Sequence, residues 1–224
     1  MNALAVRYPS MSPVVLGRHT SGVSTEHYFS ADPSTPAKAV QVEFTIRGRS
    51  YRLDSASGVF SANRLDAGTA VLLKKGDLPT AATTGALLDL GCGYGPIAAV
   101  LASEAPAAEV YGIDVNSRAR ELTAANAEKL GVRITVTGPD EVPADVTFAQ
   151  IWSNPPTHVG KAELHNILER WLPRLSPDGV AWLVINRHLG GDSLHTWLVD
   201  GGWVVERKAS QKGFRVLRVT RKTD

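Results

Sequence analysis

A chain of 224 residues can form one full-sized domain with a small addition, and it is too short for two ordinary domains. Its 43% hydrophobic and 21% charged residues are typical of a globular protein and exclude a disordered or collagen-like chain. The net charge of +2 is unevenly spread, because residues 85–204 hold 14 acidic and 8 basic residues whereas residues 206–224 hold 7 basic and 2 acidic ones. Basic ends around an acidic middle suit a polyanionic partner, although ordinary surface charge explains the same pattern.

Cysteine content and hydropathy limit the possible metal sites and the possible location in the cell. The single cysteine, Cys92, cannot form an internal disulfide, and no Cys/His spacing is typical of a zinc site, so we expect no metal. No apolar run approaches the roughly 20 residues that a membrane helix needs. A secretory signal has a basic start followed by an apolar stretch, and residues 1–13 lack this pattern. We therefore expect a cytoplasmic protein without membrane association.

The amino-terminal part predicts an arm followed by a hairpin. The first 40 residues show no convincing period and predict a partly ordered arm. Apolar and polar residues then alternate over residues 40–53 around an Arg47-Gly48 turn, which indicates two antiparallel strands. A short amphipathic segment near residues 65–73 predicts a helix that leads into the next unit.

From Leu87 onward, short apolar runs alternate with helical patterns. Such repeated β-α-β units predict a mainly parallel sheet whose strands are buried on both faces and joined by right-handed helical crossovers. We expect strands near residues 87–90, 109–114, 132–136, 147–152 and 180–185, and helices near residues 96–104, 117–130 and 162–173.

The carboxy-terminal part departs from this alternation. A helix is expected over residues 194–199, and two strands over residues 203–208 and 214–220 are too close for anything but an antiparallel hairpin. The predicted fold is therefore α/β and Rossmann-like, with a mainly parallel seven-stranded sheet that ends in an antiparallel pair. We expect a main domain over residues 61–224 and an arm with a β-hairpin extension over residues 1–60. All five tryptophans lie in apolar runs, which predicts core positions.

A glycine-rich loop over residues 91–95 joins the first strand of the sheet to a helix with Pro96 in its first turn. Glycines let the backbone approach a ligand closely, and the helix start offers free N–H groups. An NAD site is disfavoured because Pro96 replaces the third small residue of the dinucleotide fingerprint. Asp89, two residues before the loop, would repel a pyrophosphate and suits a ligand with an ammonium group. A structural turn without a ligand remains the alternative.

Two further aspartates follow predicted strands. Asp114 closes the second strand, where an acid beside the glycine loop can accept both hydroxyl protons of an adenosine ribose. Asp140 follows the third strand and could accept a proton from an adenine amine or cap a turn with Pro139. Solvated aspartates at strand ends are the alternative for both.

The fourth strand ends in Asn154-Pro155-Pro156. Two consecutive prolines fix φ twice and keep Asn154 out of the helical region, so the corner is rigid. At the carboxyl end of a strand, the Asn154 side-chain oxygen and the Pro155 carbonyl are two fixed acceptors that suit the two protons of an NH2 group. A rigid turn without function is the alternative.

Together these motifs resemble a known family. The glycine loop with Asp89, Asp114 and the Asn-Pro-Pro corner resemble class I S-adenosylmethionine-dependent methyltransferases that modify planar exocyclic amines. The flanking signatures are similar to the ribosomal RNA small-subunit guanine-N2 methyltransferase family, over roughly residues 27–220. These signatures are His27-Tyr28-Phe29-Ser30, Gly58-Val59-Phe60-Ser61 with Asp66-Ala67-Gly68-Thr69, and residues 154–161.

The resemblance implies a cofactor, S-adenosyl-L-methionine, and a target, a guanine N2 amine of 16S ribosomal RNA. It implies that Asn154 and Pro155 hold the target amine as catalytic residues, and that the substrate also contacts Pro156, Thr157, His158 and Phe60. The cofactor-binding residues that it implies are Asp89, Gly91, Cys92, Gly93, Gly95, Asp114, Val115, Asp140 and Asn154.

Two departures from the family pattern leave alternatives open. Thr157 stands where base-modifying members commonly have an aromatic residue that stacks on the extruded base, so His158 or Phe60 would have to substitute. Several bacterial relatives also carry a second, degenerate domain where this chain has an arm and hairpin. We expect ribosomal RNA or the small ribosomal subunit as partner and a monomer or homodimer. The alternatives are methylation of adenine N6, a protein glutamine or a small molecule, or a catalytically silent cofactor- or RNA-binding module.

Overall fold

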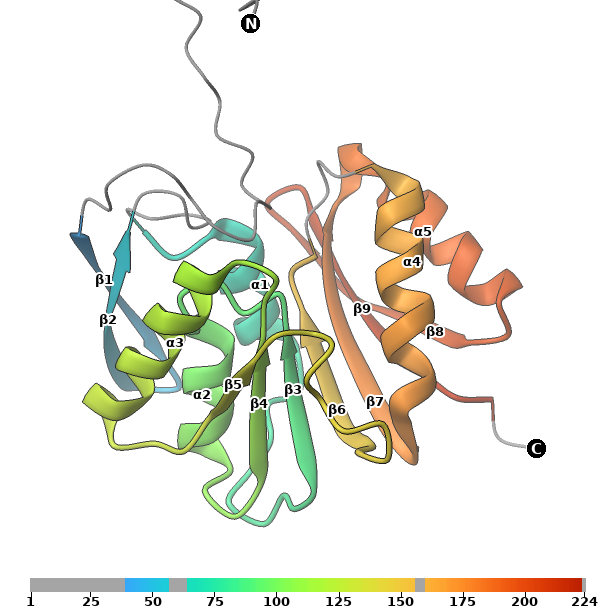
Figure 1. Ribbon diagram of the computed structural model, residues 1–224. Helices are drawn as coiled ribbons and strands as arrows, with labels where there is room; N and C mark the ends of the chain where they lie inside the picture. The colour runs from blue at the N-terminus through green and yellow to red at the C-terminus, as the bar shows by residue number, and fades with distance from the viewer. Residues whose placement is uncertain (1–38, 57–63, 156–159, 223–224) are drawn as a thin grey trace, which may run out of the picture.

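The computed structural model describes residues 39–56, 64–155 and 160–222. A two-stranded hairpin stands beside a seven-stranded sheet of order β5-β4-β3-β6-β7-β9-β8 (Figure 1). The hairpin strands are β1 (Ala39–Ile46) and β2 (Arg49–Ala56). The larger sheet consists of β3 (Ala86–Leu90), β4 (Glu109–Ile113), β5 (Thr135–Thr137), β6 (Phe148–Ser153), β7 (Leu175–Asn186), β8 (Val204–Gln211) and β9 (Phe214–Thr220).

The pairing of the strands confirms the predicted α/β fold. The pairs β5·β4, β4·β3, β3·β6 and β6·β7 are parallel, and the pairs β7·β9 and β9·β8 are antiparallel. The predicted arm and the predicted domain boundary near residue 60 lie outside the described residues, so the division of the chain into 1–60 and 61–224 stays a prediction.

Within the described ranges, five α-helices cover the two faces of the sheet (Figure 1). The first three, with the hairpin, pack on one face, and the last two pack on the other. Among the described residues, no helix has the length and apolar character that crossing a membrane requires. The helices are α1 (Ala67–Lys75), α2 (Pro96–Glu104), α3 (Ser117–Leu130), α4 (Lys161–Trp171) and α5 (Gly191–Asp200), and short 3-10 turns occupy Leu172–Arg174 and Arg187–Leu189.

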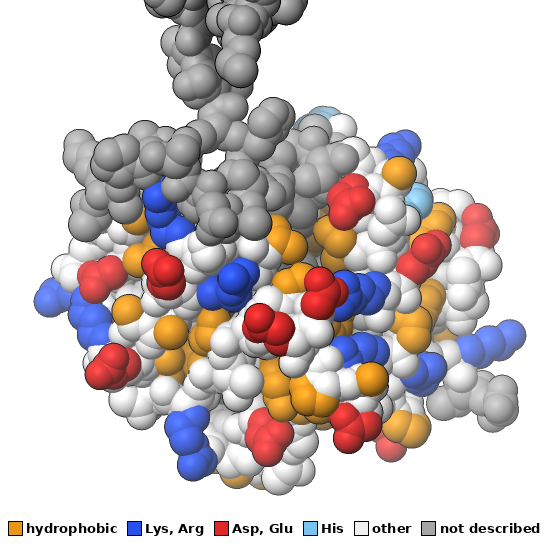
Figure 2. Space-filling view, in the orientation of Figure 1, with side chains coloured by type: hydrophobic (Ala, Val, Ile, Leu, Met, Phe, Trp, Pro, Cys, Tyr) orange, Lys and Arg blue, Asp and Glu red, His pale blue; other side chains and the backbone are white. Residues whose placement is uncertain are grey.

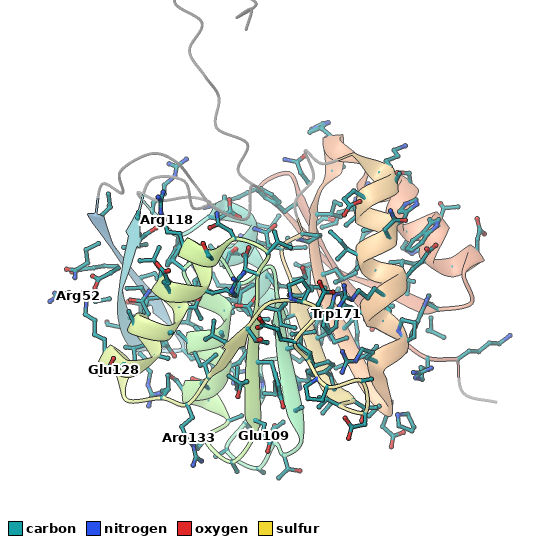
Figure 3. All side chains as sticks on the ribbon, in the orientation of Figure 1. Arg52, Glu109, Arg118, Glu128, Arg133 and Trp171 are labelled. Atoms are coloured by element: carbon teal, nitrogen blue, oxygen red, sulfur yellow. The ribbon has the colours of Figure 1, made fainter. Side chains whose placement is uncertain are left out.

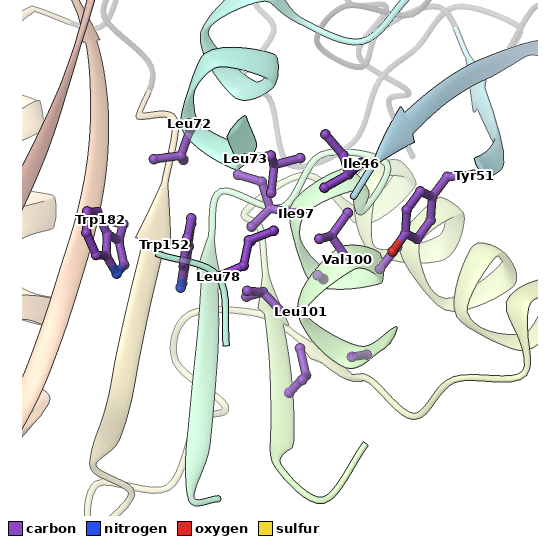
Figure 4. Close-up of a cluster of buried hydrophobic side chains, with 14 of the residues drawn as sticks. Ile46, Tyr51, Leu72, Leu73, Leu78, Ile97, Val100, Leu101, Trp152 and Trp182 are labelled. Carbon is purple, nitrogen blue, oxygen red and sulfur yellow. The ribbon is translucent and has the colours of Figure 1, made fainter. Parts of the chain in front are cut away.

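The core on the α1–α3 face joins the hairpin to the main sheet. Trp152 of β6 and Trp182 of β7 lie side by side with ring centroids 5.6 Å apart, and Leu72 of α1 packs above them (Figure 4). The hairpin adds the buried side chains Ile46 and Tyr51 to the same cluster. The period-2 alternation of the hairpin therefore supplies one apolar face, which packs against the helices.

Asn126 of α3 ties the hairpin to the loop before α2. Its Oδ1 accepts the N–H of Asp54 at 2.8 Å, and its Nδ2 donates to the carbonyls of Asp54 at 2.8 Å and Tyr94 at 2.9 Å. Because the side chain is 1% exposed, these bonds satisfy backbone groups that water does not reach.

The core on the α4–α5 face holds the remaining tryptophans. Trp171 of α4 is buried against the sheet on this face (Figure 3). Trp152 and Trp182 are buried on the opposite face, so the predicted core positions of these three tryptophans are confirmed. Trp197 and Trp203 are only partly buried at the edge of this core, and Trp197 stacks on the His165 ring with 3.9 Å between centroids. On the face shown in Figure 2, acidic and basic side chains are interspersed.

Candidate active site

Most of the predicted site residues that the structure describes lie at the carboxyl ends of β3, β4 and β6, and Asp140, which follows β5, is the exception. The chain builds the sheet from β3 outward through β4 to one side and through β6 to the other, so β3 lies where the strand order reverses. Open α/β sheets bind ligands at this point. Asp89 pairs in register with Trp152, and Ser153 Oγ donates to the carbonyl of Leu90 at 2.7 Å. The next residues of the two strands, Gly91 and Asn154, therefore follow at neighbouring positions.

The three glycines of the loop share a backbone conformation but differ in their surroundings. All have left-handed φ values, +78° at Gly91, +58° at Gly93 and +84° at Gly95. A Cβ at Gly95 would lie 2.9 Å from the Thr123 Cγ2 atom, so glycine is required there for packing against α3. A Cβ at Gly91 would have no heavy atom of the described residues within 4 Å, and Gly91 is exposed. Gly91 therefore borders open space, whereas Gly93 and Gly95 are buried.

Asp89 is buried at the base of this loop, with 1% of its surface exposed. Its Oδ2 accepts the N–H of Ala98 in the first turn of α2 at 2.8 Å. Its Oδ1 has no hydrogen-bond partner within the described part of the chain. Burial raises the pKa of this carboxyl to about 7. A buried acceptor without a partner, two residues before the exposed Gly91, fits a ligand that brings a hydrogen-bond donor or a positive charge.

Asp114, directly after β4, fixes the glycine loop. Its Oδ2 accepts the N–H of Gly93 at 2.9 Å, and its Oδ1 accepts the N–H of Asn116 at 2.9 Å. Burial raises the pKa of this carboxyl as well. Each carboxylate oxygen can accept a second bond, so the group can hold its turn and still receive ribose hydroxyls. Val115, next along the chain, is 44% exposed.

Cys92 and Asp140 are placed differently from these acids. The Cys92 side chain is buried and its sulfur receives a 3.4 Å hydrogen bond from the Thr123 hydroxyl, which also donates to the Gly93 carbonyl at 2.9 Å. The Asp140 side chain is 86% exposed and forms an ion pair of 2.8 Å with Arg170 of α4. Their predicted contacts with a cofactor stay predictions.

The amide of Asn154 has a defined orientation. Its Nδ2 donates to Asp66 Oδ1 at 2.7 Å and to Thr69 Oγ1 at 3.0 Å. Both amide hydrogens are thus directed at α1, and Oδ1 is the end that is left as an acceptor. Pro155 is buried. The predicted substrate contacts Pro156, Thr157, His158 and Phe60 lie outside the described residues.

Four residues without a predicted role support this site. Asn116 caps α3 by accepting the N–H groups of Arg118 and Ala119, and its own N–H donates to Asp114, so the first turn of α3 lies beside Asp114. Arg118 of this turn is labelled in Figure 3. Thr123 supports the glycine loop, and Asp66 and Thr69 hold Asn154. The N-cap pattern of Asp66 was visible in the sequence, but its contact with residue 154 required the tertiary structure.

A glycine bend at the switch point of an α/β sheet, with one buried and one strand-end acid, defines a Rossmann-like site for a nucleoside cofactor. Comparisons with known proteins agree with a site of this class. Residues 50–218 match the family model "Methyltransferase small domain". The chain is 35% identical to the uncharacterized protein YbxB of Bacillus subtilis, over 87% of this chain and 98% of that protein.

Two further relatives span more than this chain does. The ribosomal RNA small subunit methyltransferase C of Pseudomonas entomophila is 33% identical over 89% of this chain and 59% of that protein. A solved structure of the T. thermophilus 16S rRNA N2 G1207 methyltransferase, in complex with AdoMet and guanosine, shares the fold with a TM-score of 0.69 and 24% identity. That match covers 85% of this chain and 52% of the other, so this chain spans little more than half the length of these two proteins.

The chain belongs to the methyltransferase small domain family. This confirms the predicted class, an S-adenosylmethionine-dependent methyltransferase of Rossmann-like fold. The residues at this site fit the cofactor. Among the described residues, Gly91 leaves open space, Asp89 has a buried acceptor without a partner, and Asp114 places a carboxylate at the end of a strand.

Proposed function

We propose that this protein methylates the N2 amine of a guanine in 16S ribosomal RNA, and that it acts in the cytoplasm. The observation that carries the proposal is the acceptor end of the Asn154 amide, which has no hydrogen-bond partner among the described residues and follows its strand next to Gly91. The named activities of the two ribosomal RNA methyltransferases above support it. Because this chain spans only part of those proteins, its RNA substrate is not carried over with the fold.

The proposed chemistry depends on alignment. When bound, S-adenosylmethionine supplies a methyl group that is already electrophilic because it is attached to a cationic sulfur. Asn154 Oδ1 and the Pro155 carbonyl would accept the two hydrogens of the target amine and turn its lone pair out of the base plane. Transfer of that methyl group to the lone pair would break the carbon–sulfur bond, whose electron pair would stay on sulfur, and the nitrogen would then lose a proton to solvent.

The acceptors also stabilise the positive charge that develops on the nitrogen. No strong base is needed, since the nitrogen becomes acidic as it is methylated. We propose that Asp114 holds the cofactor ribose, that Asp89 faces its charged end and that Val115 packs against its adenine. Cys92, Gly93, Gly95 and Asp140 complete the proposed cofactor set.

Asn154→Ala tests the proposal. Removing a preorganised polar group that acts on developing charge costs on the order of 10²- to 10³-fold in rate, so we expect kcat to fall by about that factor while S-adenosylhomocysteine still binds. The assay supplies labelled cofactor and RNA from cells that lack the protein, separates 16S from 23S RNA, and digests each to nucleosides. Labelled N2-methylguanosine from 16S RNA is the expected product.

Other products decide between the alternatives. Label in N6-methyladenosine, in a protein fraction or in a small molecule would overturn the guanine assignment and would favour another planar amine, an outcome that Thr157 in place of an aromatic residue makes chemically reasonable. Cofactor binding without transfer to any fraction would identify a silent binding module. An Asn154→Ala variant with full activity would remove Asn154 from the mechanism.

A further inference from the structure

We infer that Asp66 and Thr69 are positioning residues that hold the Asn154 amide with its oxygen toward the target amine. This inference rests on the proposed function. An asparagine side chain has nearly the same shape in its two flipped orientations, so its hydrogen-bond partners decide which end faces a substrate. Both partners here come from the first turn of α1.

The donors and acceptors of the three side chains are consistent with one orientation. Asp66 Oδ1 receives an Asn154 Nδ2 hydrogen at 2.7 Å, and Thr69 Oγ1 receives the other at 3.0 Å. An ionised carboxylate can only accept. If the amide were flipped, Asn154 Oδ1 would face the carboxylate oxygen at this short distance, and two acceptors would repel each other. The negative charge of Asp66 therefore selects the orientation.

The first turn of α1 holds these two partners in place. Asp66 is the N-cap of α1, and its Oδ1 also accepts the N–H of Thr69 at 2.9 Å. The same carboxylate oxygen thus begins the helix and binds Asn154, which lies 88 residues away in the sequence. Thr69 is 4% exposed, so its hydroxyl is held within the protein.

Packing around Gly68 restricts the carboxylate further. A Cβ at Gly68 would lie 3.0 Å from Asp66 Oδ1 and 3.0 Å from the Phe214 Cε1 atom of β9. A side chain at this position would push against both. Glycine therefore leaves the room that the Asp66 carboxylate and the Phe214 ring occupy, and the antiparallel strand β9 supports the first turn of α1.

Removal of both acceptors is the first test. Asp66→Ser keeps a competent N-cap but is too short to hold the amide, and Thr69→Val removes the hydroxyl at nearly constant volume. In the double variant, kcat for RNA methylation should fall about 10- to 100-fold through misplacement of Asn154. S-adenosylhomocysteine affinity should be unchanged, and Thr69→Ser should retain activity. Thr196→Val, which removes an exposed hydroxyl from α5, is the matched control and should be active.

Exchange of the polar groups is the second test, and it does not depend on loss of function. Asn154→Asp alone places two carboxylates together and should abolish turnover. Adding Asp66→Asn lets the new amide donate through its NH2 group to one oxygen at residue 154 and accept the Thr69 N–H through its own oxygen, which leaves the second oxygen at residue 154 free. The combined variant should therefore be at least about tenfold more active than Asn154→Asp alone, a coupling that two independent structural roles would not produce.

The outcomes separate this inference from the proposed function. If the wild type methylates RNA and Asn154→Ala does not, a fully active Asp66→Ser/Thr69→Val variant, or the absence of rescue in the exchanged pair, overturns the positioning role alone. If the wild type transfers no methyl group to RNA, the proposed function fails first. A thermal melt of each variant with S-adenosylhomocysteine establishes that it is folded and binds ligand.

Discussion

Asp89 places a carboxyl group where water does not reach it, and its protonation is therefore coupled to folding. Burial raises the pKa of the folded protein's carboxyl to about 7, whereas an aspartate in an unfolded chain titrates near about 3.9. Between these pH values the folded protein binds more protons than the unfolded chain. The stability that Asp89 contributes is therefore complete below about pH 4 and is lost as the pH rises through about 7.

Asp89→Asn tests this coupling. Asparagine can still accept the Ala98 N–H but does not titrate, so the variant should lose the part of the wild-type decline in unfolding free energy between pH 5 and pH 8 that Asp89 causes. Urea unfolding at both pH values measures the difference. Asp178→Asn, at an exposed aspartate of β7, should keep the wild-type slope. If the unfolding free energy of the wild type and of Asp89→Asn changed equally with pH, the raised pKa of the Asp89 carboxyl would be contradicted.

At the scale of the elements, the loop between β3 and α2 begins with Gly91. We expect glycine at this position to leave space for the ligand, because it is not needed for packing. Gly91 and Gly131, the C-cap of α3, have left-handed φ values of +78° and +68°, and a Cβ at either would meet no atom within 4 Å in the part of the chain that the structure describes. Alanine at each should therefore cost a similar backbone strain, about 1 to 2 kcal/mol.

The two alanine variants should differ in ligand binding. The methyl group at residue 91 would project into the space assigned to the cofactor, so Gly91→Ala should weaken S-adenosylhomocysteine binding by about tenfold or more, which corresponds to about 1.4 kcal/mol. Gly131→Ala should bind as the wild type does. Calorimetric titration of both variants measures this. Equal affinities would show that the cofactor does not approach Gly91.

Local sequence determined most of the elements. Residues 96–104 and 117–130 were predicted as helices and match α2 and α3, because Pro96 begins one helix and Asn116 and Gly131 bound the other. The insertion of β9 between β7 and β8 was not predictable, since a carboxy-terminal hairpin can join a sheet through either strand. Likewise, the Asp66–Asn154 bond depends on how α1 packs across β6 and β7, which no local pattern encodes.

At the scale of the whole molecule, the β1–β2 hairpin is part of the same core as the catalytic unit. Its buried residues join the cluster formed by α1 and α2, and Asn126 binds Asp54 of the hairpin and Tyr94 of the glycine loop at once. The hairpin therefore stabilises the loop beside the site. On the outer edge of the hairpin, Arg52 pairs with Glu43 on the surface (Figure 3).

We propose that the Asn154-Pro155 corner after β6 and the glycine loop over residues 91–95 form the two sides of one methyl-transfer site. A crystal structure with S-adenosylhomocysteine and guanosine tests it most directly. We predict the ribose on Asp114, the sulfur above Gly91 and the guanosine N2 amine between that sulfur and Asn154 Oδ1. A guanosine bound elsewhere, or an Asn154 oxygen turned toward Asp66 and away from the amine, would contradict the account.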